Sequence, residues 1–158
     1  MQTMKIIIFI VVILFFNQYA QNIFAQKSQA NTYRDPTQRN QVVQSEKIKS
    51  IFNDISKSIS SNKIELLSMY IFKQVKISLL GAEIGYFSEN QVTSILENYF
   101  NSRRVVDFKL PSIKTSDEGP YATGGGHWNI KGKQEKFQVY ITIAEQEKRW
   151  VITQFKIY

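Results

Sequence analysis

Apolar residues recur along this chain at two spacings, and the spacing changes near residue 105. Between Ser45 and Ser60 they follow one another at intervals of three or four residues, which places them on one face of a helix. The residues of this apolar stripe are Ile48, Ile51, Phe52, Ile55 and Ile59. The spacing therefore predicts a helix that begins near Ser45 and ends at the polar residues 60–62.

Capping patterns predict two more helices. Asn62 precedes Glu65 by three residues, which is the spacing of a capping box, and this predicts a short helix over about residues 63–70. We expect its inward side chains to be Leu66, Leu67 and Tyr70. A second box, formed by Ser88 and Gln91, predicts a longer helix that ends at residues 101–104. The apolar stripe of this helix runs through Val92, Ile95, Leu96, Tyr99 and Phe100.

Strict alternation of apolar and polar residues predicts the strands. The first covers residues 75–79 and is followed by a loop or hairpin turn at 81–85. Four more are predicted at 105–110, 121–130, 137–143 and 150–158. The alternation of the last is ambiguous, which predicts a β-bulge there. The glycine triplet 124–126 predicts a strong bend, or the close approach of a helix or a second subunit.

This order of elements predicts an α+β fold, in which helices gather on one face of an antiparallel sheet. Because one strand is interrupted by glycines, we expect the sheet to be strongly bent. The helices would then pack in its concave face and form a cone that encloses a cavity.

The first 25 residues are organised as a secretory signal peptide. Lys5 precedes an unbroken apolar run at residues 6–16, which is shorter than the roughly 20 residues that span a bilayer. We expect cleavage after Ala25, with Ala20 as the second choice, and an uncleaved N-terminal anchor is the alternative. Cleavage would leave no stable membrane anchor, and the product would reside in a bacterial periplasm or be secreted.

Residues 26–44 are rich in Gln and Asn and show no apolar period. They predict a flexible linker between the signal peptide, residues 1–25, and a single domain over residues 45–158.

The composition excludes several kinds of site. The chain has no cysteine and one histidine, so it holds no disulfide, no zinc–thiolate or iron–sulfur site, and no site that needs two imidazoles. Lys and Arg total 20 against 13 acidic residues, for a net charge of +7, but these cations are spread along the domain. Nucleic-acid binding favours clustered cations with interleaved aromatic residues. We therefore expect no cofactor, no metal and no nucleic-acid partner.

Short pieces from residue 51 to the end resemble a known family in their order and spacing. They are Ile51-Phe52 through Ile55, Val75–Leu79, Tyr86-Phe87-Ser88 with Gln91, Tyr99-Phe100, Tyr121-Ala122 with Gly124, Phe137–Ile141, and Trp150–Ile152 with Gln154-Phe155. The family comprises small exported bacterial proteins of unknown function with a nuclear transport factor 2-like, or cystatin-like, fold. The resemblance covers about two thirds of the chain. It implies the fold and export, and it carries no catalytic residue over.

Some enzymes of this fold move protons with an Asp or His inside the cone, so the ionisable residues on the strands are informative. Successive side chains on a strand point to opposite faces. We expect Val106, Phe108 and Leu110 to face the helices, and Asp107 then points away from them. The same alternation directs Ala122 and Trp128 inward.

Alternation in the glycine-containing strand therefore directs Tyr121 and His127 away from the helices. Tyr140, in the following strand, is expected on the same outer face of the sheet, together with Gln138 and Thr142. We predict that Tyr121, His127 and Tyr140 form a face for a partner or ligand. Ordinary cross-strand packing is the alternative role for these side chains.

Two classes of function remain open. The first is a non-enzymatic binding or scaffold module that uses the cone or the outer sheet face. Its partner would be a second copy on the sheet face, a small apolar ligand or a peptide. The second is a small lyase, isomerase or hydrolase with its active site in the cone. An ionisable side chain that opens into the cone would favour the enzyme, and the alternation favours the binding module.

Overall fold

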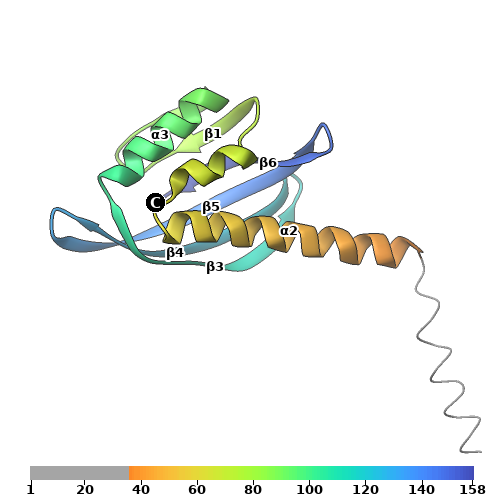
Figure 1. The fold of residues 1–158 in the computed structure, drawn as a ribbon. Helices are drawn as coiled ribbons and strands as arrows, with labels where there is room; N and C mark the ends of the chain where they lie inside the picture. The colour runs from red at the N-terminus through yellow and green to blue at the C-terminus, as the bar shows by residue number, and fades with distance from the viewer. Residues whose placement is uncertain (1–35) are drawn as a thin grey trace, which may run out of the picture. The chain divides into compact units, whose positions relative to one another are not determined.

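The computed structural model describes residues 36–158, and the predicted signal peptide lies outside these residues. Residues Ser45–Tyr158 form one compact unit. Its chain order is helix, 3-10 helix, hairpin, helix and a four-stranded meander (Figure 1). The elements are α2 (Pro36–Ser60), η1 (Ile64–Tyr70), β1 (Gln74–Ser78), β2 (Ile84–Ser88), α3 (Glu89–Asn101), β3 (Arg104–Ser116), β4 (Gly119–Ile130), β5 (Lys133–Gln146) and β6 (Arg149–Ile157).

Helix α2 begins at Pro36 and not near Ser45, so residues 36–44 are helical where we expected a flexible linker. Proline favours the first helical position because the N–H that it lacks would have no partner there. No glycine or second proline interrupts the residues that follow. The apolar stripe starts only at Ile48, and it therefore gave no signal for the first turns of the helix.

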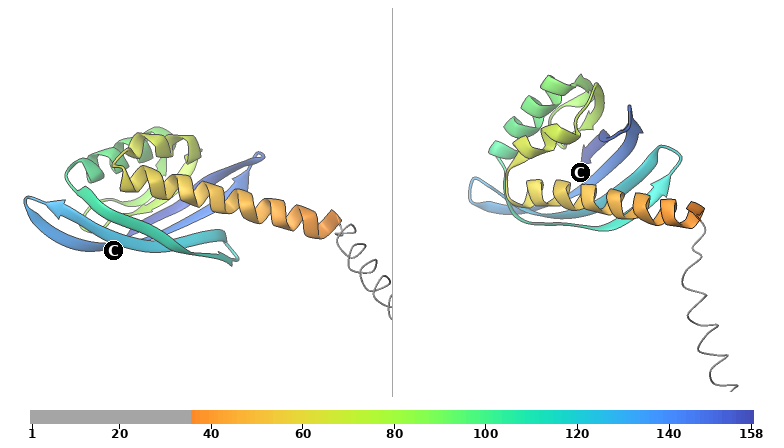
Figure 2. Two further views of the ribbon diagram at one scale, coloured as in Figure 1. Left: turned by 60° about the horizontal axis from the view of Figure 1, so that its bottom comes forward. Right: turned by 45° about the vertical axis from the view of Figure 1, so that its right-hand side comes forward.

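The six strands form one curved sheet in the order β2-β1-β6-β5-β4-β3. Neighbouring strands are antiparallel, except that β1 and β6 run parallel. The helices lie on one side of the sheet (Figure 2), and the predicted α+β architecture is confirmed. The five-residue strand β2 was missed, because only the hairpin turn before it was predicted.

Strand β3 differs from the prediction at its start. Val105 is 4% exposed and Val106 is 57% exposed, so Val105 and not Val106 faces the helices. The reason is a register shift between Val105 and Asp107, which interrupts the alternation. Phe108 is buried as expected, and Asp107 does point away from the helices.

The bulge predicted in the last strand is confirmed. Thr142 pairs with Gln154 and Ile143 pairs with Ile152, which leaves Thr153 as an extra residue in β6. The extra residue explains why Ile152 and Phe155, which lie three positions apart, are both buried on the same face of the sheet.

Apolar side chains from both layers fill the space between helices and sheet. The indole of Trp128 stacks on Phe137 with ring centroids 4.2 Å apart, and Phe137 stacks on Phe108 at 5.6 Å. Among the described residues, the buried polar side chains are those of Ser58, Thr142 and Gln154, and these carry no ionisable group. The concave side of the sheet is therefore a packed core.

The first predicted capping box is wrong. Asn62 lies at a φ of 55° and does not cap η1, whose N-cap residue is Lys63. Its side-chain amide instead bonds the backbone of Val105, accepting from N–H at 2.8 Å and donating to C=O at 3.1 Å. Leu66 was expected inside but is 48% exposed, since the 3-10 geometry directs Ile64 and Leu67 to the core.

The second predicted capping box is confirmed. Gln91 Oε1 accepts the backbone N–H of Ser88 at 3.0 Å and its hydroxyl at 2.9 Å. These bonds fix the junction between β2 and α3, which follow each other without a loop.

The glycine triplet permits a close approach, but the segment that approaches is the neighbouring strand β3 and not the predicted helix. A Cβ atom at Gly124 or Gly126 would collide with the backbone carbonyl of Lys109 or Asp107, respectively. Only glycine therefore lets β4 approach β3 this closely. The curvature of the sheet depends on this approach together with the register shifts of β3.

Candidate functional site on the outer face of the sheet

The three predicted site residues lie on the face of the sheet opposite the helices, which we call the outer face. On β4, Tyr121, Thr123, Gly125 and His127 alternate with the inward residues. Thr123 pairs with Tyr140 of β5 across the ladder, so these two side chains share the outer face. Tyr121, His127 and Tyr140 thus point away from the helices, as the alternation predicted.

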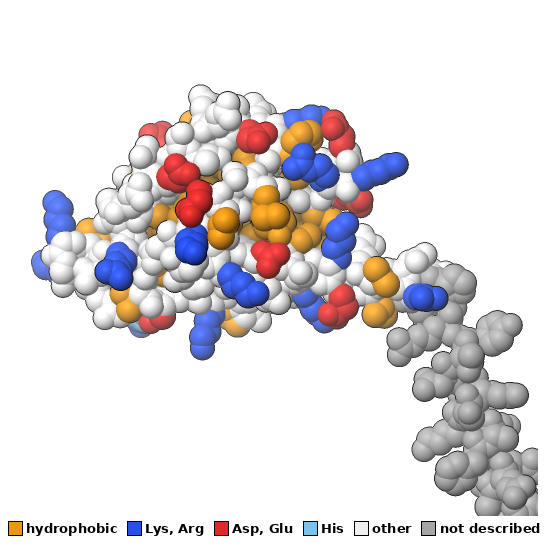
Figure 3. Space-filling view, in the orientation of Figure 1, with side chains coloured by type: hydrophobic (Ala, Val, Ile, Leu, Met, Phe, Trp, Pro, Cys, Tyr) orange, Lys and Arg blue, Asp and Glu red, His pale blue; other side chains and the backbone are white. Residues whose placement is uncertain are grey.

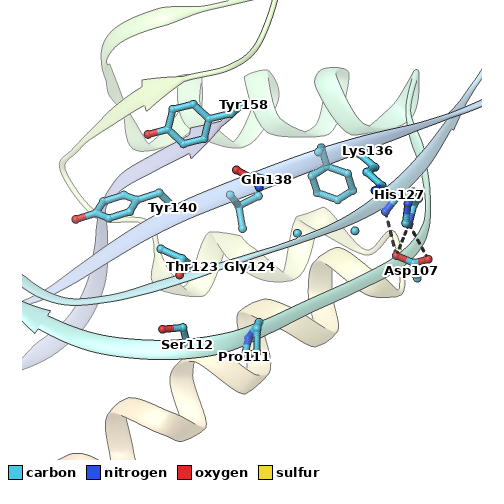
Figure 4. Close-up of a pocket in the computed structure, with 14 residues that line it drawn as sticks. Asp107, Pro111, Ser112, Thr123, Gly124, His127, Lys136, Gln138, Tyr140 and Tyr158 are labelled. Carbon is cyan, nitrogen blue, oxygen red and sulfur yellow. Dashed lines mark hydrogen bonds and ion pairs between the residues drawn. The ribbon is translucent and has the colours of Figure 1, made fainter.

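A shallow depression of about 670 Å³ occupies the middle of this face (Figure 4). Its floor is the glycine triplet of β4, where no side chain covers the backbone. The remaining lining residues, from β3, β4, β5 and the end of the chain, are Asp107, Pro111, Ser112, Thr123, His127, Lys136, Phe137, Gln138, Val139, Tyr140 and Tyr158. The glycines that allow the sheet to bend therefore also make the recess.

One end of the depression holds an acid–base pair. The imidazole Nδ1 of His127 lies 3.0 and 3.1 Å from the two carboxylate oxygens of Asp107, and the backbone N–H of His127 donates to Oδ1 at 3.0 Å. The carboxylate therefore fixes the orientation of the ring. The side chain of Asp107 is 58% exposed and that of His127 is 33% exposed. Catalytic acid–base groups work best where water is excluded, and this pair is open to water.

The other end of the depression is aromatic. The rings of Tyr121 and Tyr140 stack at 5.0 Å with an interplanar angle of 27°. The ammonium group of Lys156, on β6, lies 5.4 Å from the centroid of the Tyr140 ring, a cation–π contact. Tyr158 stands beside Tyr140 at this end (Figure 4). This end thus offers ring surface together with positive charge.

Several polar side chains of the depression have no partner within the described protein. These are the hydroxyl groups of Ser112, Thr123, Tyr140 and Tyr158 and the side-chain amide of Gln138, which make no hydrogen bond to any residue in 36–158. Such groups remain free to bond a ligand. Alternation alone missed Ser112, Lys136 and Tyr158. The ladder pairing of His127 with Lys136 would have found the lysine.

Arg103 follows the end of α3 and acts as a helix-end cation. Its Nη1 donates to the carbonyl of Tyr99 at 3.1 Å, and the guanidinium lies 3.9 Å from the Tyr99 ring centroid. Burial raises the pKa of the Tyr99 hydroxyl, and the positive charge of Arg103 opposes that rise. The arginine thus closes the helix and packs on its aromatic neighbour.

Charge elsewhere on the surface is mixed. Lysines and arginines alternate with acidic side chains over the face seen in Figure 3. Within residues 36–158, no group of three acidic or histidine side chains is placed to hold a metal ion. In the same part of the chain, none of the helices combines the length and the apolar character needed to cross a bilayer.

Comparison with known proteins identifies relatives. A family profile described as "Domain of unknown function (DUF4783)" matches residues 52–158, which is more than half of the chain. No curated protein matches. The crystal structure of a DUF4783 family protein from Bacteroides uniformis is 14% identical, with a TM-score of 0.59, and the alignment covers 66% of this chain and 93% of that one.

Two further structures share the fold. The protein Rd1NTF2_04 with long sheet is 7% identical, with a TM-score of 0.55, over 70% of this chain and 98% of its own. An LEH-like epoxide hydrolase from M. tuberculosis is 10% identical, with a TM-score of 0.50, over 67% of this chain and 77% of its own. At such identities the likeness shows the fold alone, and it confirms the predicted nuclear transport factor 2-like fold.

Proposed function

The chain belongs to the DUF4783 family, and we propose that this member is an exported, non-enzymatic binding module whose ligand site is the depression on the outer face. The observation that carries the proposal is the set of polar side chains around the glycine floor that have no protein partner. Binding sites commonly combine a recess with a few convergent polar groups.

The packed concave side supports the outer face as the binding surface and argues against the cone. Catalysis in the cone would need an acid, a base or an activated nucleophile there. Among the buried residues within 36–158, Tyr99 is the one ionisable side chain, and its hydroxyl donates to the carbonyl of Leu80, while the hydroxyl of Ser58 donates to the carbonyl of Asp54. The stacked pair of Trp128 and Phe137 occupies the inner face directly behind the depression. A ligand is therefore better accommodated on the opposite side of these rings.

Binding of small probes tests the proposal. A ¹⁵N-labelled protein would be screened by NMR against mixtures of aromatic acids, sugars, dipeptides and small apolar molecules. We expect shift changes that cluster at Thr123, Gln138 and Tyr140. Gln138→Arg should abolish them by filling the recess, while Gln134→Arg, on the same strand outside the lining residues, should retain them. Shift changes confined to the interior, or none with any mixture, would reject the outer-face site.

A second copy of the chain is the alternative occupant of the same face. The partly exposed Tyr121–Tyr140 stack would be covered if two outer faces packed together. Sedimentation velocity distinguishes the two cases. A dimer that dissociates in Tyr140→Arg, with unchanged circular dichroism, would favour self-association over the binding of a small ligand.

An enzyme remains the second candidate function, because Asp107 and His127 are paired in the depression. Hydrolysis of ester or epoxide substrates that disappears in both Asp107→Asn and His127→Ala, with folding retained, would establish it. Export has its own test, which is the mass of the mature protein. Removal of residues 1–25 is expected, and an intact Met1 in periplasmic material would contradict it.

A further inference from the structure

We infer that the depression binds an acidic sugar chain, meaning an oligosaccharide that carries carboxylate groups. This inference rests on the proposed function and names its ligand class. Three features of the outer face, taken together, specify such a ligand: its charge, its free hydrogen-bonding groups and its aromatic surface.

The charge around the depression favours an anion. Lys136 lines it, Lys156 lies over Tyr140, and Lys109 pairs with Gly125 of the floor, so that its side chain leaves the same face of the sheet. None of these three lysines forms an ion pair with a carboxylate within residues 36–158. Asp107 is the one acidic side chain among the lining residues, and it is bonded to His127. Lysines from three strands thus surround a recess with a single, partnered carboxylate.

The free hydrogen-bonding groups favour a ligand rich in hydroxyls. Four hydroxyl groups and one amide line the depression without a protein partner, and each both donates and accepts. A sugar hydroxyl has the same dual capacity, so either partner can take either role in each bond. A simple organic anion would satisfy the lysines but leave most of these groups to water.

The pairing of the sheet argues against an extended peptide. Recognition of a peptide by strand addition needs free backbone N–H and C=O groups at the edge of a sheet. The floor belongs to β4, which is paired with β3 on one side and β5 on the other, so its backbone groups are already used. Recognition must therefore come from side chains. The face of the Tyr121 ring that is not stacked on Tyr140 offers flat apolar surface to the C–H face of a sugar ring.

The test compares three probes of similar length by calorimetry and NMR: oligogalacturonate, a neutral malto-oligosaccharide and oligoglutamate. We expect oligogalacturonate to shift the resonances of Thr123 and Gln138 and to bind at least tenfold more tightly than either other probe. Its affinity should fall several-fold between 50 and 200 mM salt, because exposed charges are screened. Equal binding of oligoglutamate would overturn the inference in favour of charge alone, and equal binding of the neutral sugar would overturn the role of the lysines.

Variants separate the site from general electrostatics. Lys136→Gln and Lys109→Gln should each weaken oligogalacturonate binding about fivefold to tenfold, a range set by about one lost charge contact each. Lys57→Gln, an exposed lysine of α2 with the same charge change, should leave the affinity unchanged. Equal loss in all three variants would overturn the assigned site. If neutral small probes shift the depression and oligogalacturonate does not, this inference fails while the proposed function stands. If nothing shifts the depression, both fail.

Discussion

Removal of the Asn62 side chain should destabilise the fold through β3, which lies at an edge of the sheet. The amide of Asn62 bonds both the N–H and the C=O of Val105, at 2.8 and 3.1 Å, and so replaces the neighbouring strand that the edge lacks at this point. Val105 is 4% exposed, and its backbone groups would have limited access to water after the change. The residue also holds a φ of 55°, which asparagine tolerates better than alanine.

These contacts determine how much unfolding free energy we expect the Asn62 variants to lose. Two hydrogen bonds contribute about 1 kcal/mol each, reduced here because Asn62 itself is exposed. The left-handed backbone adds about 1 kcal/mol for alanine. We therefore expect Asn62→Ala to lower the free energy of unfolding by about 2–3 kcal/mol and Asn62→Gly by about 1–2 kcal/mol, since glycine accepts the positive φ.

Urea denaturation followed by tryptophan fluorescence measures both variants, because Trp128 is buried in the core and is the residue that pairs with Val105 across the ladder. Asn53→Ala, an exposed asparagine within α2, serves as the control and should change the unfolding free energy by less than about 0.5 kcal/mol. An Asn62→Ala midpoint equal to that of the control would refute the assigned role of the amide. If Asn62→Ala and Asn62→Gly lose the same unfolding free energy, the positive φ at this position contributes nothing to the difference, and that part of the reasoning is refuted.

Three further changes test local features. Ser88→Ala should cost about 0.5–1 kcal/mol in urea denaturation, because Gln91 loses the hydroxyl but keeps the backbone N–H, and an unchanged midpoint would count against the cap. Thr142→Val should stabilise by about 1 kcal/mol, since the hydroxyl is buried without a partner, and a loss of stability would show that it has one. Burial, the hydrogen bond to Asp54 at 2.7 Å and the charge of that carboxylate raise the pKa of Tyr70 to about 12. A phenol with a raised pKa stabilises the fold below its unfolded value of 10.0, and this contribution is lost as the pH rises through 10–12. Tyr70→Phe should therefore show a shallower fall of stability in that range, and an identical slope would contradict the assignment.

Much of the outer face was predictable, because period-two alternation survives wherever the ladder is regular. Strand β4 pairs with β5 without a shift, and Tyr121, His127 and Tyr140 lie on the face that the sequence indicated. Strand β3 shows the limit of this reasoning. Val105 and Val106 are the same residue type, so hydropathy could not tell which of them faces the core once a bulge intervened. In β6 the odd spacing of the apolar residues Ile152 and Phe155, which share one face, marks the bulge that the ambiguous alternation predicted.

Local motifs were less decisive when a distant partner competed for the same side chain. Asn62 and Ser88 both begin a capping-box spacing, yet only Ser88 uses it. The amide of Asn62 bonds a residue 43 positions away, and the sequence around Asn62 contains no pattern that predicts this contact. The polar groups of the depression were missed for a related reason. Ser112 reaches the depression through the register shift of β3 between Lys109 and Ser112, and Lys136 reaches it through its ladder pairing with His127.

The bend of the sheet and the candidate site have one physical cause. The glycine triplet allows the carbonyls of β3 to approach β4 where a Cβ atom at Gly124 or Gly126 would collide, and β3 has a register shift between Val105 and Asp107 beside this approach. The same shift places Asp107 opposite His127, and the same glycines leave the floor of the depression bare. A substitution such as Gly126→Ala would therefore disturb the fold and the recess together. For this reason the binding tests rely on exposed side chains at the rim, such as Lys136 and Gln138, which change the site without changing the backbone that forms it.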